Sequence, residues 1–185
     1  MTGLFGGAFD PPHNGHVALA RAALEHYDLQ RLLVLVIVDP GHKHAELEFE
    51  QRFELARLAF ADLPRTDVHP EGHARTVDAL RAHHFADALS LIGADEFADF
   101  LSWKDPNEVL ALTRLAVATR PGYAREKLDP VLAALEQPDR VQFFEIPAVD
   151  ASSRAIRARI RNGEPVNGLV PHAVAREIEV GGLYR

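Results

Sequence analysis

The chain has 185 residues, of which 47% are hydrophobic, and its formal net charge at pH 7 is −7. This length and apolar content suit one globular domain with a substantial core, so we predict a single domain over residues 1–185. The negative charge argues against general nucleic-acid binding, and the longest apolar run, Leu32 to Val38, is too short to cross a bilayer. The absence of cysteine excludes disulfides and thiolate chemistry. With no signal peptide ahead of the first motif, a cytoplasmic location is expected.

A short apolar segment around Leu4 predicts the first strand, and a glycine turn joins this strand to a predicted helix. Gly6 and Gly7 allow a tight turn that brings the backbone close to a ligand, and free N–H groups at the start of the helix can receive phosphate oxygens. His13 and His16 lie three residues apart, so both can face the same side of the first helical turn. Neither standard glycine-rich phosphate motif is present. The histidines therefore carry the chemistry, unless the segment is a plain turn with two surface histidines.

Residues 6–16 read G-G-A-F-D-P-P-H-N-G-H and closely resemble the G-G-T-F-D-P-x-H-x-G-H signature of the nucleotidyltransferase superfamily. The resemblance implies that Gly6, Gly7, Ala8, Phe9, His13 and His16 bind ATP. It places the first histidine near the phosphates and lets His16 donate to the α-phosphate as that group is attacked. The superfamily's usual threonine is Ala8 here, so backbone N–H groups must replace its hydroxyl.

The rest of the chain alternates between strand and helix patterns. Leu32 to Val38 is continuously apolar and rich in β-branched residues, which is typical of a central parallel strand beside the strand at Leu4. Further strands are predicted at 66–69, 88–92, 115–119 and 141–146, and helices at 16–28, 49–63, 76–84, 105–112 and 126–136. This order predicts an α/β fold, a Rossmann-like doubly wound sheet with mainly parallel strands and helices on both faces. Ligands of such folds bind beyond the carboxyl ends of the strands.

The loop after the second strand contains a candidate phosphate-binding lysine. Residues 39–44 read D-P-G-H-K-H, and Lys43 is either a cation for a substrate phosphate or an ordinary solvated lysine. The loop resembles the Pro-Pro-His-Lys segment of nucleotidyltransferases that form dinucleotides, with His42 and Lys43 matching. The resemblance implies that Lys43 binds the substrate.

Two later segments resemble bacterial nicotinate-nucleotide adenylyltransferases. Residues 74–80 read A-R-T-V-D-A-L against the family's S-Y-T-x-D-T-L, so Thr76 matches and Arg75 replaces a tyrosine. Residues 93–104 resemble the family's G-x-D and L-x-x-W pattern, with Gly93, Asp95 and Trp103 matching.

The second resemblance implies a site for a nucleotide and a pyridine ring. Asp95 can accept hydrogen bonds from ribose hydroxyls, although an aspartate after a strand is often only a helix cap. Trp103, the only tryptophan, stacks on the pyridine ring in that family; the other interpretation is a core residue. Backbone N–H groups near Thr76 and Lys104, assisted by Arg75, are expected to hold the nicotinate carboxylate.

The last group of candidate site residues lies at the start of a predicted helix, in residues 151–160. Ser152 and Ser153 suit a helix N-cap, and capping alone would explain them. A helix N-terminus with hydroxyls and Arg157 one turn later also suits a triphosphate. The segment resembles the family's I-S-S-x-x-I-R motif, which implies that Ser152, Ser153 and Arg157 bind ATP. Ile156 and Ile160 are expected to pack inward.

Together the resemblances imply adenylyl transfer from ATP to nicotinate mononucleotide, giving nicotinate adenine dinucleotide and pyrophosphate, a step of NAD biosynthesis. The expected partners are these two substrates, with Mg²⁺ carried mainly on the ATP phosphates. No protein-bound metal is assigned, because the histidine pairs at 42/44, 69/73 and 83/84 complete no zinc pattern. Nothing in the sequence fixes an oligomeric state.

Three alternatives stay open at this point. The acceptor could be nicotinamide mononucleotide or another phosphate such as phosphopantetheine. The chain could be a nucleotide-binding module without catalysis, which the departure at Ala8 favours. The histidine pairs could also belong to a metal-dependent hydrolase.

Overall fold

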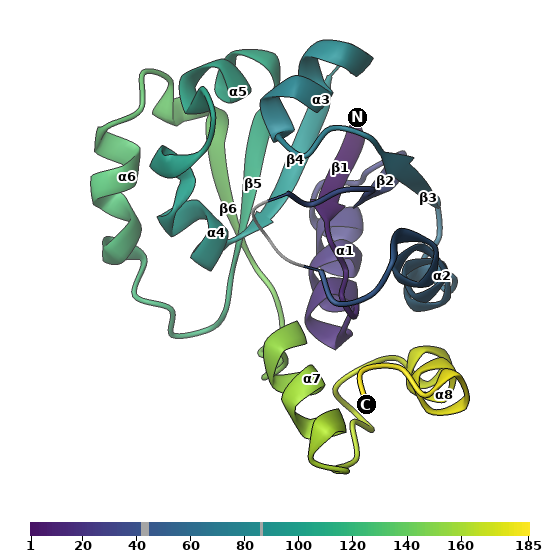
Figure 1. Cartoon of the computed structure of the whole chain (residues 1–185). Helices are drawn as coiled ribbons and strands as arrows, with labels where there is room; N and C mark the ends of the chain where they lie inside the picture. Colours follow the sequence, from purple (N-terminus) through teal and green to yellow (C-terminus); the bar gives the residue numbers. More distant parts are fainter. Residues whose placement is uncertain (42–44, 86) are drawn as a thin grey trace.

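The computed structural model describes residues 1–41, 45–85 and 87–185. Within them, six parallel strands form one sheet in the order β3-β2-β1-β4-β5-β6 (Figure 1). The strands are β1 (Thr2–Gly7), β2 (Arg31–Ile37), β3 (Thr66–Glu71), β4 (Ala88–Gly93), β5 (Arg114–Thr119) and β6 (Val141–Glu145). This strand order is that of a doubly wound, Rossmann-like α/β fold, which confirms the predicted fold class.

The helices connect the strands and follow the last one. They are α1 (Asn14–His26), α2 (Phe49–Phe60), α3 (Thr76–His83), α4 (Ala94–Ala98), α5 (Pro106–Leu112), α6 (Asp129–Ala133), α7 (Ser153–Arg161) and α8 (His172–Gly181). Short 3-10 turns cover Phe100–Ser102, Arg125–Leu128 and Pro138–Arg140. No helix of these described residues is long and apolar enough to cross a membrane.

Four elements differ from the sequence prediction. The helix expected over 126–136 is a 3-10 turn followed by the short α6, because Pro130 lacks an N–H group and begins a helix more readily than it continues one. β3 continues beyond His69 through Pro70 to Glu71, which an edge strand tolerates. The helices α4 and α8 were not predicted.

Alternating side chains of the central strands enter two separate cores. In β2, Leu32, Val34 and Val36 belong to the core that also contains residues of α1, α2, α7 and α8. Leu33 and Leu35 belong to the second core, with residues of α3, α4, α5 and α6. The sheet is therefore covered on both faces, as the continuous apolar run of β2 predicts.

The sheet opens between β1 and β4. These strands pair only from Thr2 with Ala88 to Leu4 with Ser90, whereas β1 pairs with β2 as far as Gly7 with Val36. Strand order reverses at this point of the sheet, because β2 and β3 lie to one side of β1 and the later strands to the other. Such a switch point leaves a crevice at the carboxyl ends of the strands, where ligands bind in folds of this kind.

The C-terminal segment returns to this edge. In Figure 1, α7 and α8 lie below the carboxyl ends of the strands, and α8 packs against α2. The Tyr184 hydroxyl donates to Asp10 Oδ1 at 2.7 Å, and both residues are buried. The end of the chain is thus joined to the loop that follows β1.

Candidate active site

One cavity of about 740 Å³ occupies the crevice at the carboxyl ends of β1 and β4. It is lined by every predicted site residue that the structure describes. These are Gly6, Gly7, Ala8, Phe9, His13, His16, Arg75, Thr76, Gly93, Asp95, Trp103, Lys104, Ser152, Ser153 and Arg157. Lys43 lies outside the described residues. Segments separated by as many as 150 residues in the sequence therefore meet at one site.

The turn after β1 uses its two glycines differently. A Cβ at Gly6 would have no atom within 4 Å, so the backbone is open there, as predicted. A Cβ at Gly7 would come within 3.0 Å of the Phe9 ring. Phe9 is itself buried, with φ of 50°, and its ring packs edge-on against Phe5 and Phe60. Gly7 thus makes room for a core side chain, and Phe9 can meet a ligand mainly through its backbone.

A buried arginine holds this turn against the end of β2. Arg52 of α2 is 1% exposed, and its guanidinium donates to the carbonyl oxygens of Ala8, Ile37 and Val38 at 2.8–2.9 Å and to that of Leu47 at 3.1 Å. Buried charge is tolerated where every donor has an acceptor. Arg52 was not predicted from the sequence, because an arginine inside a helix pattern resembles a surface residue.

The two histidines of the motif stack on each other at the start of α1. Their ring centroids lie 3.7 Å apart at an interplanar angle of 22°. His13 is the N-cap residue of α1, and its backbone N–H donates to Nδ1 of His16 at 3.1 Å. Because Nδ1 of His16 is an acceptor, a neutral His16 ring carries its hydrogen on Nε2. The ring is therefore held as a hydrogen-bond donor through Nε2.

Both imidazoles are held in the neutral form. Burial, with a smaller effect from the positive charge of Arg120, lowers the pKa of His13 to about 4. Burial and the neighbouring His13 hold the pKa of His16 well below its ordinary value. At neutral pH the pair thus offers N–H donors without adding positive charge.

The start of α7 docks against the same turn. Ser152 caps the helix by accepting from the Ala155 N–H at 3.2 Å, and the Ser153 hydroxyl donates to the Pro11 carbonyl at 2.8 Å. Ile156 is fully buried and Ile160 is partly buried, as predicted. The N-termini of α1 and α7 therefore converge on the cavity, where their free N–H groups favour an anion.

Arg157 reaches the cavity from one turn into α7, but it already has partners. Its guanidinium donates to the Asp10 carbonyl at 2.6 Å and to Glu46 Oε1 at 2.7 Å. Glu46 also contacts Arg161, and these two arginines lower the pKa of its carboxyl. The Arg157 side chain is 18% exposed. The guanidinium that was predicted to bind a phosphate is thus already paired with the Glu46 carboxylate.

The other end of the cavity combines an aromatic ring with a helix start. Trp103 is half-buried and packs edge-on against Phe100, with ring centroids 5.2 Å apart. Thr76 is the first residue of α3, whose initial N–H groups have no acceptor within the helix. The Lys104 ammonium pairs with Asp78 at 2.8 Å, so its charge is partly used, while Arg75 is exposed at the mouth. This end can hold a flat ring and a small anion.

Asp95 lies at the rim between these ends. It is exposed in the first turn of α4, whose N-cap residue is Gly93, so Asp95 is not the helix cap that its position after a strand suggested.

Among the further residues that line the cavity, Glu71, Arg120 and Tyr123 were not predicted from the sequence, and His73 was named only as part of a histidine pair. Arg120 follows β5 directly, and over residues 1–41, 45–85 and 87–185 it has no ion pair. Its position just beyond a strand end was the signal that could have revealed it. Glu71 and His73 were not expected at the cavity, because the predicted strand ended at His69 and β3 continues to Glu71.

The chain is similar to several known proteins. The family model for cytidylyltransferase-like proteins matches residues 4–159. A Thermus thermophilus protein named "probable nicotinate-nucleotide adenylyltransferase" is 38% identical over 192 residues, covering 99% of this chain and 98% of that protein. A Moorella thermoacetica protein of the same name is 34% identical over 198 residues, covering 100% and 91%.

A solved structure shares the fold. It is the Plasmodium falciparum nicotinic acid mononucleotide adenylyltransferase complexed with NaAD, with a TM-score of 0.77 over 99% of this chain and 96% of that one, at 15% sequence identity.

Proposed function

The chain belongs to the cytidylyltransferase-like family and, within it, to the nicotinate-nucleotide adenylyltransferases, and on this premise we propose that it transfers the adenylyl group of ATP to nicotinate mononucleotide. The observation that carries the proposal is His16, a neutral Nε2–H donor on the wall of the switch-point cavity, between two helix N-termini. The same cavity is lined by residues proposed to bind ATP, to assist the transfer and to bind the acceptor.

The reaction is a direct displacement at phosphorus. A phosphate oxygen of the mononucleotide attacks the α-phosphorus of ATP, the bond from that phosphorus to the bridging oxygen of the β-phosphate breaks, and pyrophosphate leaves. Negative charge accumulates on the non-bridging oxygens of the α-phosphate. His16 donates its Nε2 hydrogen bond to one of these oxygens, and His13 lies beside it toward the phosphates. Holding both reactants in line contributes further, without a covalent enzyme intermediate.

Cations at the other side of the cavity receive the pyrophosphate part of ATP. Arg157 exchanges Glu46 for phosphate oxygens, a change favoured by the higher charge of a triphosphate. Ser152 and the N-terminus of α7 lie beside it, and Arg120 adds a second guanidinium.

Mg²⁺ fits this site as an ion carried by ATP. Asp10 is the only carboxylate of the motif, and its two oxygens already accept from the Tyr184 hydroxyl and the Glu46 N–H. The motif therefore leaves phosphates and water as the oxygen ligands that Mg²⁺ prefers. When bound, the ion neutralises phosphate charge and eases the departure of pyrophosphate.

The acceptor binds at the end of the cavity formed by Trp103 and the start of α3. The indole stacks on the pyridine ring, and the N–H groups at Thr76 and Lys104 face the nicotinate carboxylate, with Arg75 adding positive charge. When an amide replaces the carboxylate, an NH₂ group takes the place of one acceptor oxygen. An N–H donor of the site is then left without an acceptor. The site therefore favours the acid over the amide substrate.

Acceptor choice tests the proposal. With ATP and Mg²⁺, we expect pyrophosphate release with nicotinate mononucleotide at a kcat/KM at least about tenfold above that with nicotinamide mononucleotide. Trp103→Ala should raise the KM of the mononucleotide about fivefold, the equivalent of ~1 kcal/mol for aromatic stacking, and Arg75→Ala should narrow the acid preference. Equal use of acid and amide would remove the acid-specific assignment. No pyrophosphate release with any acceptor, phosphopantetheine included, would favour a binding module without catalysis.

A further inference from the structure

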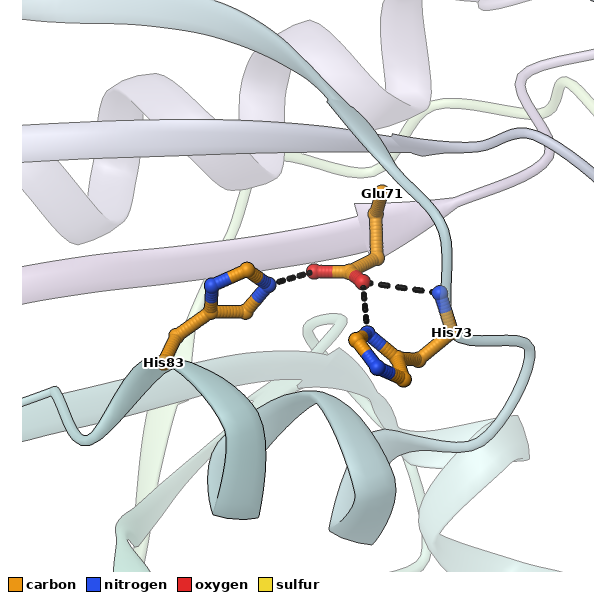
Figure 2. A group of neighbouring side chains, drawn as sticks. All are labelled: Glu71, His73 and His83. Atoms are coloured by element: carbon orange, nitrogen blue, oxygen red, sulfur yellow. Dashed lines mark hydrogen bonds and ion pairs between the residues drawn. The ribbon is translucent and has the colours of Figure 1, made fainter.

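A second cluster of ligand-type side chains lies at the end of β3, away from the two motif histidines. Figure 2 shows Glu71 between two imidazoles, His83 from the end of α3 and His73 from the connection before it. Glu71 Oε1 lies 2.7 Å from His73 Nδ1, and Oε2 lies 3.0 Å from His83 Nε2. One ligand atom of each residue lies within 4.8 Å of the others.

The carboxylate of this cluster needs a positive partner. The Glu71 side chain is 4% exposed, and in the described parts of the chain no lysine or arginine pairs with it. Its Oε1 accepts from the His73 backbone N–H at 2.8 Å. Its Oε2 is buried without a hydrogen bond, although His83 Nε2 lies 3.0 Å away. A buried carboxylate oxygen in this state is costly unless a cation satisfies it.

We propose that Glu71, His73 and His83 bind a divalent transition metal ion of the Zn²⁺ type. Two imidazole nitrogens and one carboxylate oxygen form a ligand set that suits Zn²⁺, Co²⁺ or Ni²⁺, whereas Mg²⁺ and Ca²⁺ prefer oxygen ligands alone. A cation between the three side chains gives Oε2 and His83 Nε2 a shared partner. This ion is distinct from the Mg²⁺ carried by ATP.

The position of the cluster indicates what the metal does. Its ligands come from the end of β3, the connection, and the last residue of α3, so one ion fastens both ends of the segment that carries Arg75 and Thr76. Glu71 and His73 also line the cavity. The metal is thus a clamp on the wall of the acceptor end. The metal site itself stands on the three side chains and does not depend on the proposed reaction.

The test is metal binding by the untagged full chain after removal of metals by a chelator. Titration with Co²⁺ alone should give one saturable equivalent with visible d–d absorption, and Zn²⁺ should displace it. His83→Ala should weaken binding by at least about tenfold, the smallest loss expected when a metal site is disturbed. His84→Ala is the matched control, because His84 is the exposed neighbour outside the cluster, and it should bind like wild type.

Thermal unfolding gives a second readout. At a free Zn²⁺ concentration of about 100 Kd, the Tm of wild type should rise by about 5–10 °C, and that of His83→Ala by less. Glu71→Gln, which keeps the shape of the side chain, should also lose binding. The proposal is overturned if wild type takes up no saturable metal, or if His83→Ala binds as tightly as wild type; the three residues are then only a hydrogen-bonded cluster.

Discussion

His16 can serve as a donor because its other nitrogen is already occupied. The His13 N–H fixes Nδ1 as an acceptor, and the stacked ring of His13 excludes water from one face. A protonated imidazole would also donate, but it would attract the phosphates equally before and during transfer. A neutral donor aimed at the developing charge acts more strongly in the transition state than in the ground state.

The protonation of these rings is directly measurable. Because the folded pKa of His13 is about 4, below its ordinary value of 6.5, the unfolded chain binds more protons between these two values. The free energy of unfolding should therefore fall as pH drops from 6.5 toward 4, and the stabilising contribution is complete above 6.5. In ¹H–¹⁵N spectra of the side chains, His16 should keep its Nε2–H tautomer from pH 8 to 5.5. Titration of either ring near pH 6.5 would contradict this assignment.

At the scale of elements, the contact between α7 and the turn after β1 positions the phosphate end of the site. Ser153 and Arg157 donate to the carbonyls of Pro11 and Asp10, so the first turn of α7 is fixed relative to the histidines. Glu46 holds the guanidinium in the absence of nucleotide. ATP must therefore displace a carboxylate at this point.

Arg157→Ala should weaken ATP binding by about 1.5–3 kcal/mol, the range for a hydrogen bond to a charged group, and leave mononucleotide affinity nearly unchanged. Calorimetric titration of both ligands measures this difference. Arg154→Ala is the matched control, since Arg154 is exposed on the same helix and does not line the cavity. In the converse variant, Glu46→Gln, loss of the competing charge should tighten ATP binding about 1.5- to 5-fold. Equal losses for both ligands in Arg157→Ala would make that arginine structural.

Sequence patterns predicted those elements whose signal is local. The apolar run of β2 and the serine pair at the start of α7 mark their elements directly: β2 is a strand, and Ser152 caps α7. With five residues, α4 is too short to show the helical periodicity of apolar residues from which helices are predicted. α8 was missed although Val174 and Ile178, its buried i,i+4 pair, carried a usable signal.

Site residues that belong to a contiguous motif could be predicted from the sequence. Site residues whose partners are distant in the sequence could not. The motif histidines and Arg157 were found from their spacing and resemblance. Glu46 was missed because its partner is 111 residues away, and Arg52 because its acceptors are backbone carbonyls of three other segments. Such contacts arise only from the packed fold.

At the scale of the whole molecule, the end of the chain supports the turn at its beginning. Tyr184 and Asp10 are 174 residues apart and form a buried hydrogen bond. Burial and the adjacent Asp10 raise the pKa of the Tyr184 phenol, so it stays a neutral donor. Asp10 in turn holds the Glu46 N–H at 2.6 Å. One carboxylate thus joins the C-terminal segment to two loops of the site.

Tyr184→Phe should lower the free energy of unfolding by about 1–3 kcal/mol, because it leaves a buried carboxylate oxygen without its donor. Chemical denaturation followed by circular dichroism measures the change. Tyr27→Phe is the matched control: the Tyr27 hydroxyl is buried and has no hydrogen-bond partner in the described structure, so its removal should be neutral or stabilising. Similar destabilisation by both variants would show that the ring environment, and not the bond to Asp10, sets the effect.

Dinucleotide formation by a neutral His16 can be measured by single-turnover conversion of ATP, Mg²⁺ and nicotinate mononucleotide into dinucleotide and pyrophosphate. Wild type should form the two products in equal amounts. His16→Ala should be slower by roughly 10²–10³, the loss typical of one transition-state donor, with ATP affinity little changed, while His69→Ala, whose side chain is exposed on β3, should match wild type. A near-normal rate for His16→Ala would show that His16 is not the transition-state donor, and no dinucleotide from wild type would show that the chain does not catalyse this transfer.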